Sequence, residues 1–120
     1  MSSNMFVEEK EYGEIRISDE VVKTIARLAA DNVKGVYSMT GSISEDVNEK
    51  LGRKKLLKGV KTKVDADKAV ISLNIKINYG YKIPQVSYEI QERVKSSVEN
   101  MTNLTVEAVD VYIQGINFVE

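Results

Sequence analysis

Residues 69–101 constrain the fold most, because the spacing of their apolar side chains changes partway along the stretch. Up to residue 79 every second residue is apolar, which is the period of a strand with one buried face. Pro84 stands where a helix should begin, and there its missing N–H costs nothing. Strand and helix can both bury their apolar stripes if the helix lies back on the strand. Beyond Gly80 the apolar positions follow helical spacing, at Val86, Ile90, Val94, Val98 and Met101.

The rest of the chain predicts an earlier helix and further strands. Ser18 is a good N-cap for that helix, and Gly35 is expected to end it. Asn103 is expected to stop the later helix. Strands are expected at residues 12–17, 36–39, 59–64 and 108–114, with a turn at residues 65–68. The apolar stripe of the earlier helix is Val21, Val22, Ile25, Leu28, Ala29 and Val33.

These elements predict an α+β fold with the order β-α-β followed by β-β-α-β. A two-layer sandwich is the simplest arrangement that buries both helical stripes, with a mixed sheet and the two main helices packed on one of its faces. At 120 residues the chain is expected to form one domain. We expect residues 1–11 to be a flexible N-terminal tail and residues 12–120 to be the domain, with a mobile basic segment at residues 41–59.

The chain has no cysteine and no histidine, and this narrows the classes of function. It excludes thiolate chemistry, disulfides and imidazole metal ligands, and it removes the commonest general base. We therefore expect a protein that is not an enzyme and that has no cofactor and no metal site. The acidic N-terminus lacks the apolar core of a signal peptide, and no apolar run approaches the roughly 20 residues of a membrane span. The expected location is the cytoplasm.

A run of basic residues between residues 52 and 64 is not interrupted by any acidic residue. It could bind phosphate groups of nucleic acid or lipid headgroups, or an acidic partner protein. It could equally be a solvated loop that balances the acidic N-terminal half, and both interpretations stay open. Nucleic acid is the less favoured target, because no aromatic residue for base stacking interleaves with the run. The basic residues are Arg53, Lys54, Lys55, Lys58, Lys61 and Lys63.

The sequence YGYKIP at residues 79–84 joins the long strand to the later helix. With the helix N-terminus, Tyr79, Tyr81 and Lys82 could form a small pocket for an anion or a peptide. A strand-to-helix corner that needs glycine and proline for its geometry explains the same residues, and we favour that interpretation. A small enzyme that used Lys82 or one of the tyrosines would need a strongly depressed lysine pKa at this corner.

Paired carboxylates occur at Glu45 and Asp46 and at Asp65 and Asp67. Such pairs can serve acid–base chemistry or bind a hard cation. Here they lack the glycine and the oxygen-rich spacing of a calcium loop, so turn formation is the favoured interpretation. No P-loop and no dinucleotide-binding fingerprint occurs in the sequence.

Four segments of the chain match a known family in their order and spacing. They are GEIRISDEVVKTIARLAADNVKGVYSM (residues 13–39), LGRKKLLKGVKTKV (51–64), INYGYKIPQVSYEIQERVKSSVENMTNL (77–104) and VEAVDVYIQGINF (106–118). The most specific pieces are the helix that ends in VKGV, the YG…IP corner and the closing V-x-V-x-I-x-G-I-x-F pattern. Together they resemble the alkaline shock protein 23 family of envelope stress response proteins, found mainly in Gram-positive bacteria. The second segment is most similar to that of short cytosolic members that carry the domain alone.

The resemblance implies a non-enzymatic cytosolic protein that acts in cell-envelope or lipid homeostasis. Some members of the family lie beneath the membrane through a separate membrane-anchored partner, and self-association is known in the family. For this chain the resemblance implies an interaction module that acts by protein–protein contact or as a homo-oligomer, with membrane association that is indirect. The alternative is an electrostatic binder of anionic lipid or RNA through the basic run at residues 53–63. No binding residue of the family is carried over, so the site residues above rest on residue chemistry alone.

Overall fold

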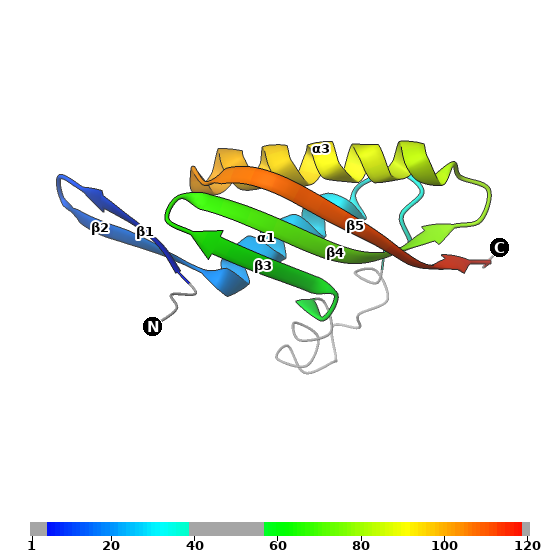
Figure 1. Ribbon diagram of the computed structural model, residues 1–120, viewed down its shortest axis with the longest axis horizontal. Helices are drawn as coiled ribbons and strands as arrows, with labels where there is room; N and C mark the ends of the chain where they lie inside the picture. Colours follow the sequence, from blue (N-terminus) through cyan, green and yellow to red (C-terminus); the bar gives the residue numbers. More distant parts are fainter. Residues whose placement is uncertain (1–4, 39–56, 119–120) are drawn as a thin grey trace.

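The elements follow the predicted order in the second half of the chain and depart from it in the first half. The computed structural model describes residues 5–38 and 57–118. Figure 1 shows α1 and α3 beside each other behind the larger sheet, so the predicted two-layer α+β fold is confirmed. The elements are β1 (Met5–Lys10), β2 (Gly13–Ser18), α1 (Asp19–Asp31), β3 (Val60–Asp65), β4 (Lys68–Asn78), α3 (Ile83–Thr102) and β5 (Thr105–Asn117).

The larger sheet has the strand order β3-β4-β5, with β3 antiparallel and β5 parallel to β4. The β3–β4 hairpin turns between Asp65 and Lys68, as predicted. The central strand β4 supplies much of the core, because its inward side chains are at most 1% exposed. These side chains are Ile71, Leu73, Ile75 and Ile77, the set that alternation in the sequence predicts.

Helix α3 connects the parallel strands β4 and β5 and covers their inner face. Pro84 lies in its first turn, and Asn103, in the left-handed conformation with φ 69°, ends it, as predicted. Met101 is 68% exposed, so its predicted place in the apolar stripe is wrong. The buried stripe continues four residues beyond Val98 to Thr102, which is 3% exposed.

Helix α1 begins where the sequence predicts and ends earlier. Ser18 is its N-cap, and the Ser18 hydroxyl accepts a hydrogen bond from the Val21 N–H at 3.3 Å. The C-cap is Asn32, so the prediction that Gly35 caps this helix is wrong. Two predicted stripe residues, Val21 and Leu28, are 46% and 41% exposed, because they lie beside the face that Val22, Ile25, Ala29 and Val33 bury.

The first half of the chain contains a hairpin that the sequence did not predict. Strand β1 pairs with β2 in an antiparallel two-stranded sheet, so residues 5–10 form a strand where a flexible tail was expected. The first predicted β-α-β unit does not form, because β2 joins β1 and Val36 makes only an isolated bridge to Ile77. Residues 1–4 lie outside the described part of the chain, and the predicted domain boundary stays a prediction. Neither α1 nor α3 is long and apolar enough to cross a bilayer.

Candidate functional site

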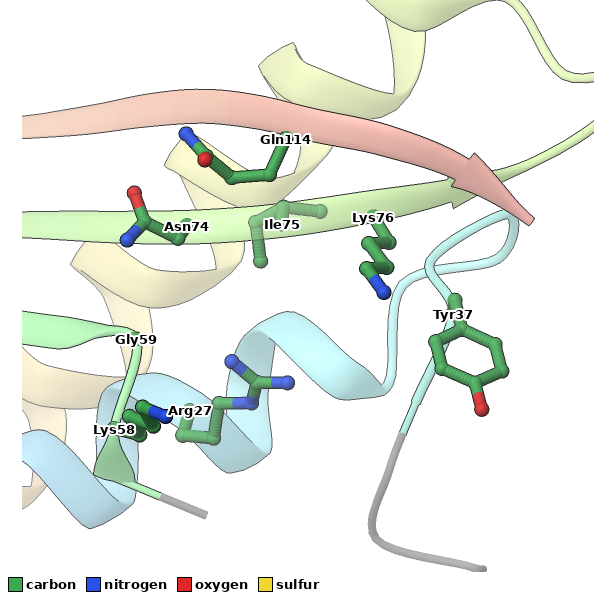
Figure 2. A pocket seen from close by; sticks show the side chains of 8 residues that line it. All are labelled: Arg27, Tyr37, Lys58, Gly59, Asn74, Ile75, Lys76 and Gln114. Atoms are coloured by element: carbon green, nitrogen blue, oxygen red, sulfur yellow. The ribbon is translucent and has the colours of Figure 1, made fainter. Parts of the chain in front are cut away.

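A hollow of about 440 Å³ opens on the side of β4 that faces β3. Two other segments hydrogen-bond to this side of β4 and leave a gap between them. The Asn74 N–H donates to the Gly59 carbonyl at 2.8 Å, just before β3 begins, and the Tyr37 N–H donates to the Lys76 carbonyl at 2.8 Å. The hollow lies between these two attachments (Figure 2). Its lining residues are Arg27, Tyr37, Lys58, Gly59, Asn74, Ile75, Lys76 and Gln114.

Arg27 reaches the hollow from α1, on the helical side of the sheet. Its guanidinium points from α1 toward β4 in Figure 2, and the residue is only 8% exposed. The Arg27 Nε atom donates to the Asp31 carboxylate at 3.4 Å, and the two side chains form an ion pair one helical turn apart. A β-carbon on Gly59 would lie 3.5 Å from Arg27 Nη1 and 3.3 Å from the Asn74 carbonyl oxygen. A larger residue than glycine would therefore be tight against the Asn74 backbone carbonyl, whereas its β-carbon would make an ordinary van der Waals contact with the guanidinium.

The other charged groups of the hollow are also cations. Lys58 precedes β3, and Lys76 lies on β4, where both residues are exposed. Figure 2 shows Lys76 on the same side of β4 as Tyr37 and Arg27. None of the lining residues that the structure describes is acidic, and the Asp31 carboxylate is engaged by Arg27 Nε. The hollow therefore concentrates positive charge on a domain whose net charge is close to zero.

The structure separates the residues of the predicted basic run. Arg53, Lys54 and Lys55 lie outside the described residues, and so does most of the segment at 41–59. Lys58 lines the hollow, whereas Lys61 and Lys63 are exposed on β3.

Lys61 and Lys63 belong to the outer face of the sheet. Lys61 is paired with Ser72 of β4, and the burial of β3 alternates, with Val60 buried on the inner side. Asn74 is paired with Tyr112 of β5 on the same outer face, where Tyr112 is 52% exposed. Part of the basic run thus lies on the polar outer face of the sheet, the face that also carries Asn74 and Tyr112.

The tyrosines of the corner at residues 79–84 turn to different partners. The Tyr79 ring stacks on Phe118, with ring centroids 5.4 Å apart. The Tyr81 ring lies against Gly35, where a β-carbon would come within 2.9 Å of it. Tyr79, Tyr81 and Lys82 do not line the hollow beside β4. A pocket formed by these three residues stays a prediction.

Sequence reasoning missed Arg27, Tyr37, Lys76 and Gln114 as lining residues of one hollow. Only Arg27 carries a local signal, because it stands four residues before Asp31, within a helix of small and apolar side chains. The other residues come together only through the pairing of distant segments along β4.

A second surface with functional potential is the β1–β2 hairpin, which extends away from the sheet and both helices (Figure 1). Ile15 and Ile17 share one face of it, since side chains two residues apart on a strand point the same way. Ile17 packs against the core, and Glu8 on that face accepts a hydrogen bond from the Asn103 side chain at 3.3 Å. Ile15 lies further out and is 49% exposed. The apolar face of the hairpin thus continues beyond the domain that supports its base.

Comparison with known proteins identifies related chains. The sequence profile of the alkaline shock protein 23 family, described by a cell envelope-related function, matches residues 7–118. The uncharacterized protein YqhY of Bacillus subtilis (strain 168) is 33% identical over 111 residues, which cover 92% of this chain and 82% of that protein. The uncharacterized protein Spy1614 of Streptococcus pyogenes serotype M6 is 34% identical over 109 residues, 89% of this chain and 90% of that protein. A solved structure named MamM-CTD superposes with a TM-score of 0.48 at 16% identity, covering 81% of this chain and 98% of that one.

Proposed function

This chain belongs to the alkaline shock protein 23 family, whose function is cell envelope-related, and from that premise we propose that it is a non-enzymatic interaction module. It works by self-association and by contact with a protein partner, and it carries out no chemistry of its own. A membrane-anchored partner would hold it at the inner face of the membrane.

The observation that carries this proposal is the exposed apolar face of the β1–β2 hairpin. A two-stranded hairpin alone in water is marginally stable at best, because it buries little apolar surface. Its base is tied to the domain through Ile17 and through the hydrogen bond between Asn103 and Glu8. Beyond that base, Ile15 keeps about half of its surface exposed, and Tyr12 at the tip is 95% exposed. A second protein surface over Ile15 would bury this apolar area and stabilise the hairpin.

The charges of the hairpin favour a second copy of the chain as one such surface. The hairpin carries four glutamates between residues 8 and 14 against one lysine and one arginine up to residue 16. At its paired positions the outer sheet face presents four lysines against two carboxylates, those of Asp65 and Asp110; the lysines are Lys61, Lys63, Lys68 and Lys76. An acidic projection and a basic face on the same molecule are complementary, which assists association between copies.

Sedimentation velocity of the full chain over a range of concentrations tests the proposal. We expect the parent to associate as its concentration rises, and Ile15→Ser to shift the equilibrium toward monomer. Val7→Ser is the matched control, because Val7 is 42% exposed and lies on the opposite face of the hairpin. If the parent stays monomeric at every concentration, self-association is wrong. In that case the proposal depends on a protein partner, which crosslinking in the native cells should capture with the parent and not with Ile15→Ser. If no such partner is captured either, the proposed function is wrong.

The alternative function is electrostatic binding of anionic lipid or RNA through the basic run at residues 53–63. The observation that favours it is the exposure of Lys61 and Lys63 on the outer sheet face. Binding to phosphates releases counterions, so its affinity must fall steeply as salt rises. Co-sedimentation with anionic vesicles, and retention on RNA, at increasing salt test this function, and Ile15→Ser, which removes the apolar contact of the hairpin, should leave both unchanged.

A further inference from the structure

We propose that the hollow beside β4 is a binding site for the phosphoryl group of a phosphate monoester, held by Arg27, Lys58 and Lys76. The site is separate from the hairpin on which the interaction proposal rests. It also differs from the basic run, since Arg27 and Lys76 lie outside that run and come from α1 and β4.

The first argument is the state of the Arg27 guanidinium. Arg27 is more than nine-tenths buried, and only its Nε atom has a hydrogen-bond acceptor, the Asp31 carboxylate, within the part of the chain that the structure describes. Nη1 and Nη2 have no acceptor within residues 5–38 and 57–118. Neither nitrogen is among the fully enclosed side-chain atoms without a partner, so both stay accessible to a ligand, and a guanidinium fork matches two oxygens of one phosphate. Asp31 meanwhile fixes the orientation of the guanidinium, so its free edge is presented to the hollow before any ligand arrives.

The second argument is the charge of the lining. Among the described residues of the site, the Asp31 carboxylate offsets the Arg27 charge, which leaves the two positive charges of Lys58 and Lys76. A phosphate monoester carries about −1.5 to −2 at pH 7, whereas a single carboxylate would leave one of these lysines without a counter-charge. Neutral donors surround the cations, because Asn74 and Gln114 carry amide groups and Tyr37 a hydroxyl.

The third argument is the size and character of the hollow. Its volume of about 440 Å³ lies in the usual range of small-molecule sites. It therefore has room for an organic group attached to the phosphate, beside the Ile75 side chain and the Tyr37 ring. The phosphoryl group could belong to a soluble monoester or to the headgroup of a phosphatidic acid lipid, which share the same chemistry at the site.

The test is a titration of the uniformly ¹⁵N-labelled full chain, followed through the Arg27 Nε–Hε signal. The probes are inorganic phosphate and glycerol 3-phosphate at constant ionic strength, and vesicles of phosphatidylcholine with and without phosphatidic acid. We expect a saturable shift of the Arg27 signal. Saturation with the soluble probes assigns a soluble ligand, and saturation with phosphatidic acid vesicles alone assigns a lipid headgroup.

Lysine variants locate the site without disturbing the buried ion pair. Lys76→Gln and Lys58→Gln should each weaken binding by about tenfold or more, the loss of one charge-assisted hydrogen bond. Lys63→Gln removes the same charge from an exposed lysine that does not line the hollow, and it should leave the affinity unchanged. Arg27→Lys should abolish the saturable shift of neighbouring amides while the variant stays folded by its amide spectrum. The proposal is overturned if no probe saturates, or if Lys63→Gln weakens binding as much as Lys76→Gln does.

Discussion

The ring of Tyr81 lies over the α-carbon of Gly35, so closely that a β-carbon at Gly35 would be 2.9 Å from two ring atoms. Gly35 also has φ +100°, which favours glycine. The contact joins the turn after α1 to the corner before α3, so it brings the VKGV and YG…IP motifs together in space. The corner thus has the geometric role that its glycine and proline suggest, and Tyr81 is one of its packing residues.

Alanine at Gly35 is predicted to destabilise the protein more than alanine at Gly80. Gly80 has a similar φ of +102°, but nothing lies within 4 Å of its would-be β-carbon. Gly80→Ala should therefore cost only backbone strain, about 1–2 kcal/mol. Gly35→Ala adds overpacking against Tyr81, about 1–3 kcal/mol more. Denaturant unfolding of both variants measures the difference, and equal losses would show that the Tyr81 contact is not a constraint.

Alanine substitutions in α3 should distinguish its buried stripe from Met101, the residue that the sequence wrongly placed in that stripe. Ile90 is 0% exposed, so Ile90→Ala should lower the free energy of unfolding by about 2–5 kcal/mol through lost burial and a cavity. Met101 is 68% exposed, and Met101→Ala should change it by about 0.5 kcal/mol or less. Thermal or urea unfolding checks both. A costly Met101→Ala would mean that a second protein surface covers this end of α3.

The elements that sequence reasoning predicts well are those whose signals are local. The alternation along β4 and the four-residue spacing from Val86 to Val98 each identify one buried face without reference to the rest of the chain. Local signals fail where two positions are both apolar but have different surroundings. Leu28 and Ala29 are neighbours in one helix, and only the placement of α3 and the sheet decides which of them is buried.

The hollow could not be predicted, because no part of it is local. Arg27, Tyr37 and Lys58 are brought together by the hydrogen bonds of Tyr37 and Gly59 to the same side of β4. Lys58 was a candidate on account of its charge, but Lys61 and Lys63, the other described lysines of the basic run, do not line the hollow. The β1–β2 hairpin was not predicted for another reason. Residues 5–10 are mixed in polarity and carry three charges, so their sequence shows no strand alternation. Strand β1 is therefore defined by its pairing with β2.

The pKa of Glu99 is predicted to lie below its ordinary value of 4.5 in the folded protein. The Val106 N–H donates to the Glu99 carboxylate at 2.8 Å and is the main cause, and the Lys95 ammonium at 3.1 Å adds to it. Because the folded pKa is lower than the unfolded one, Glu99 stabilises the fold above pH 4.5 and loses that contribution as the pH falls through the folded value. A ¹³C NMR titration of the carboxyl group measures it. Lys95→Gln should raise this pKa only partly, and a value at or above 4.5 in the parent would contradict the hydrogen bond from Val106.

The end of α3 provides a final prediction, since Thr102 makes two hydrogen bonds while buried. Its hydroxyl donates to the Val98 carbonyl at 2.6 Å and accepts from the Leu104 N–H at 3.1 Å. Thr102→Val keeps the shape of the side chain but leaves the Leu104 N–H without its acceptor, which should lower the free energy of unfolding by about 1–3 kcal/mol.

Thr24→Val is the matched control, because the Thr24 hydroxyl makes the same bond to the carbonyl four residues earlier, at 2.8 Å, in an exposed setting. That variant should change the free energy of unfolding by about 0.5 kcal/mol or less. Denaturant unfolding compares the two, with hydrogen exchange of the Leu104 amide as a local check. If both variants cost the same, or if Leu104 exchange is as slow in Thr102→Val as in the parent, the hydroxyl does not secure the passage from α3 into β5.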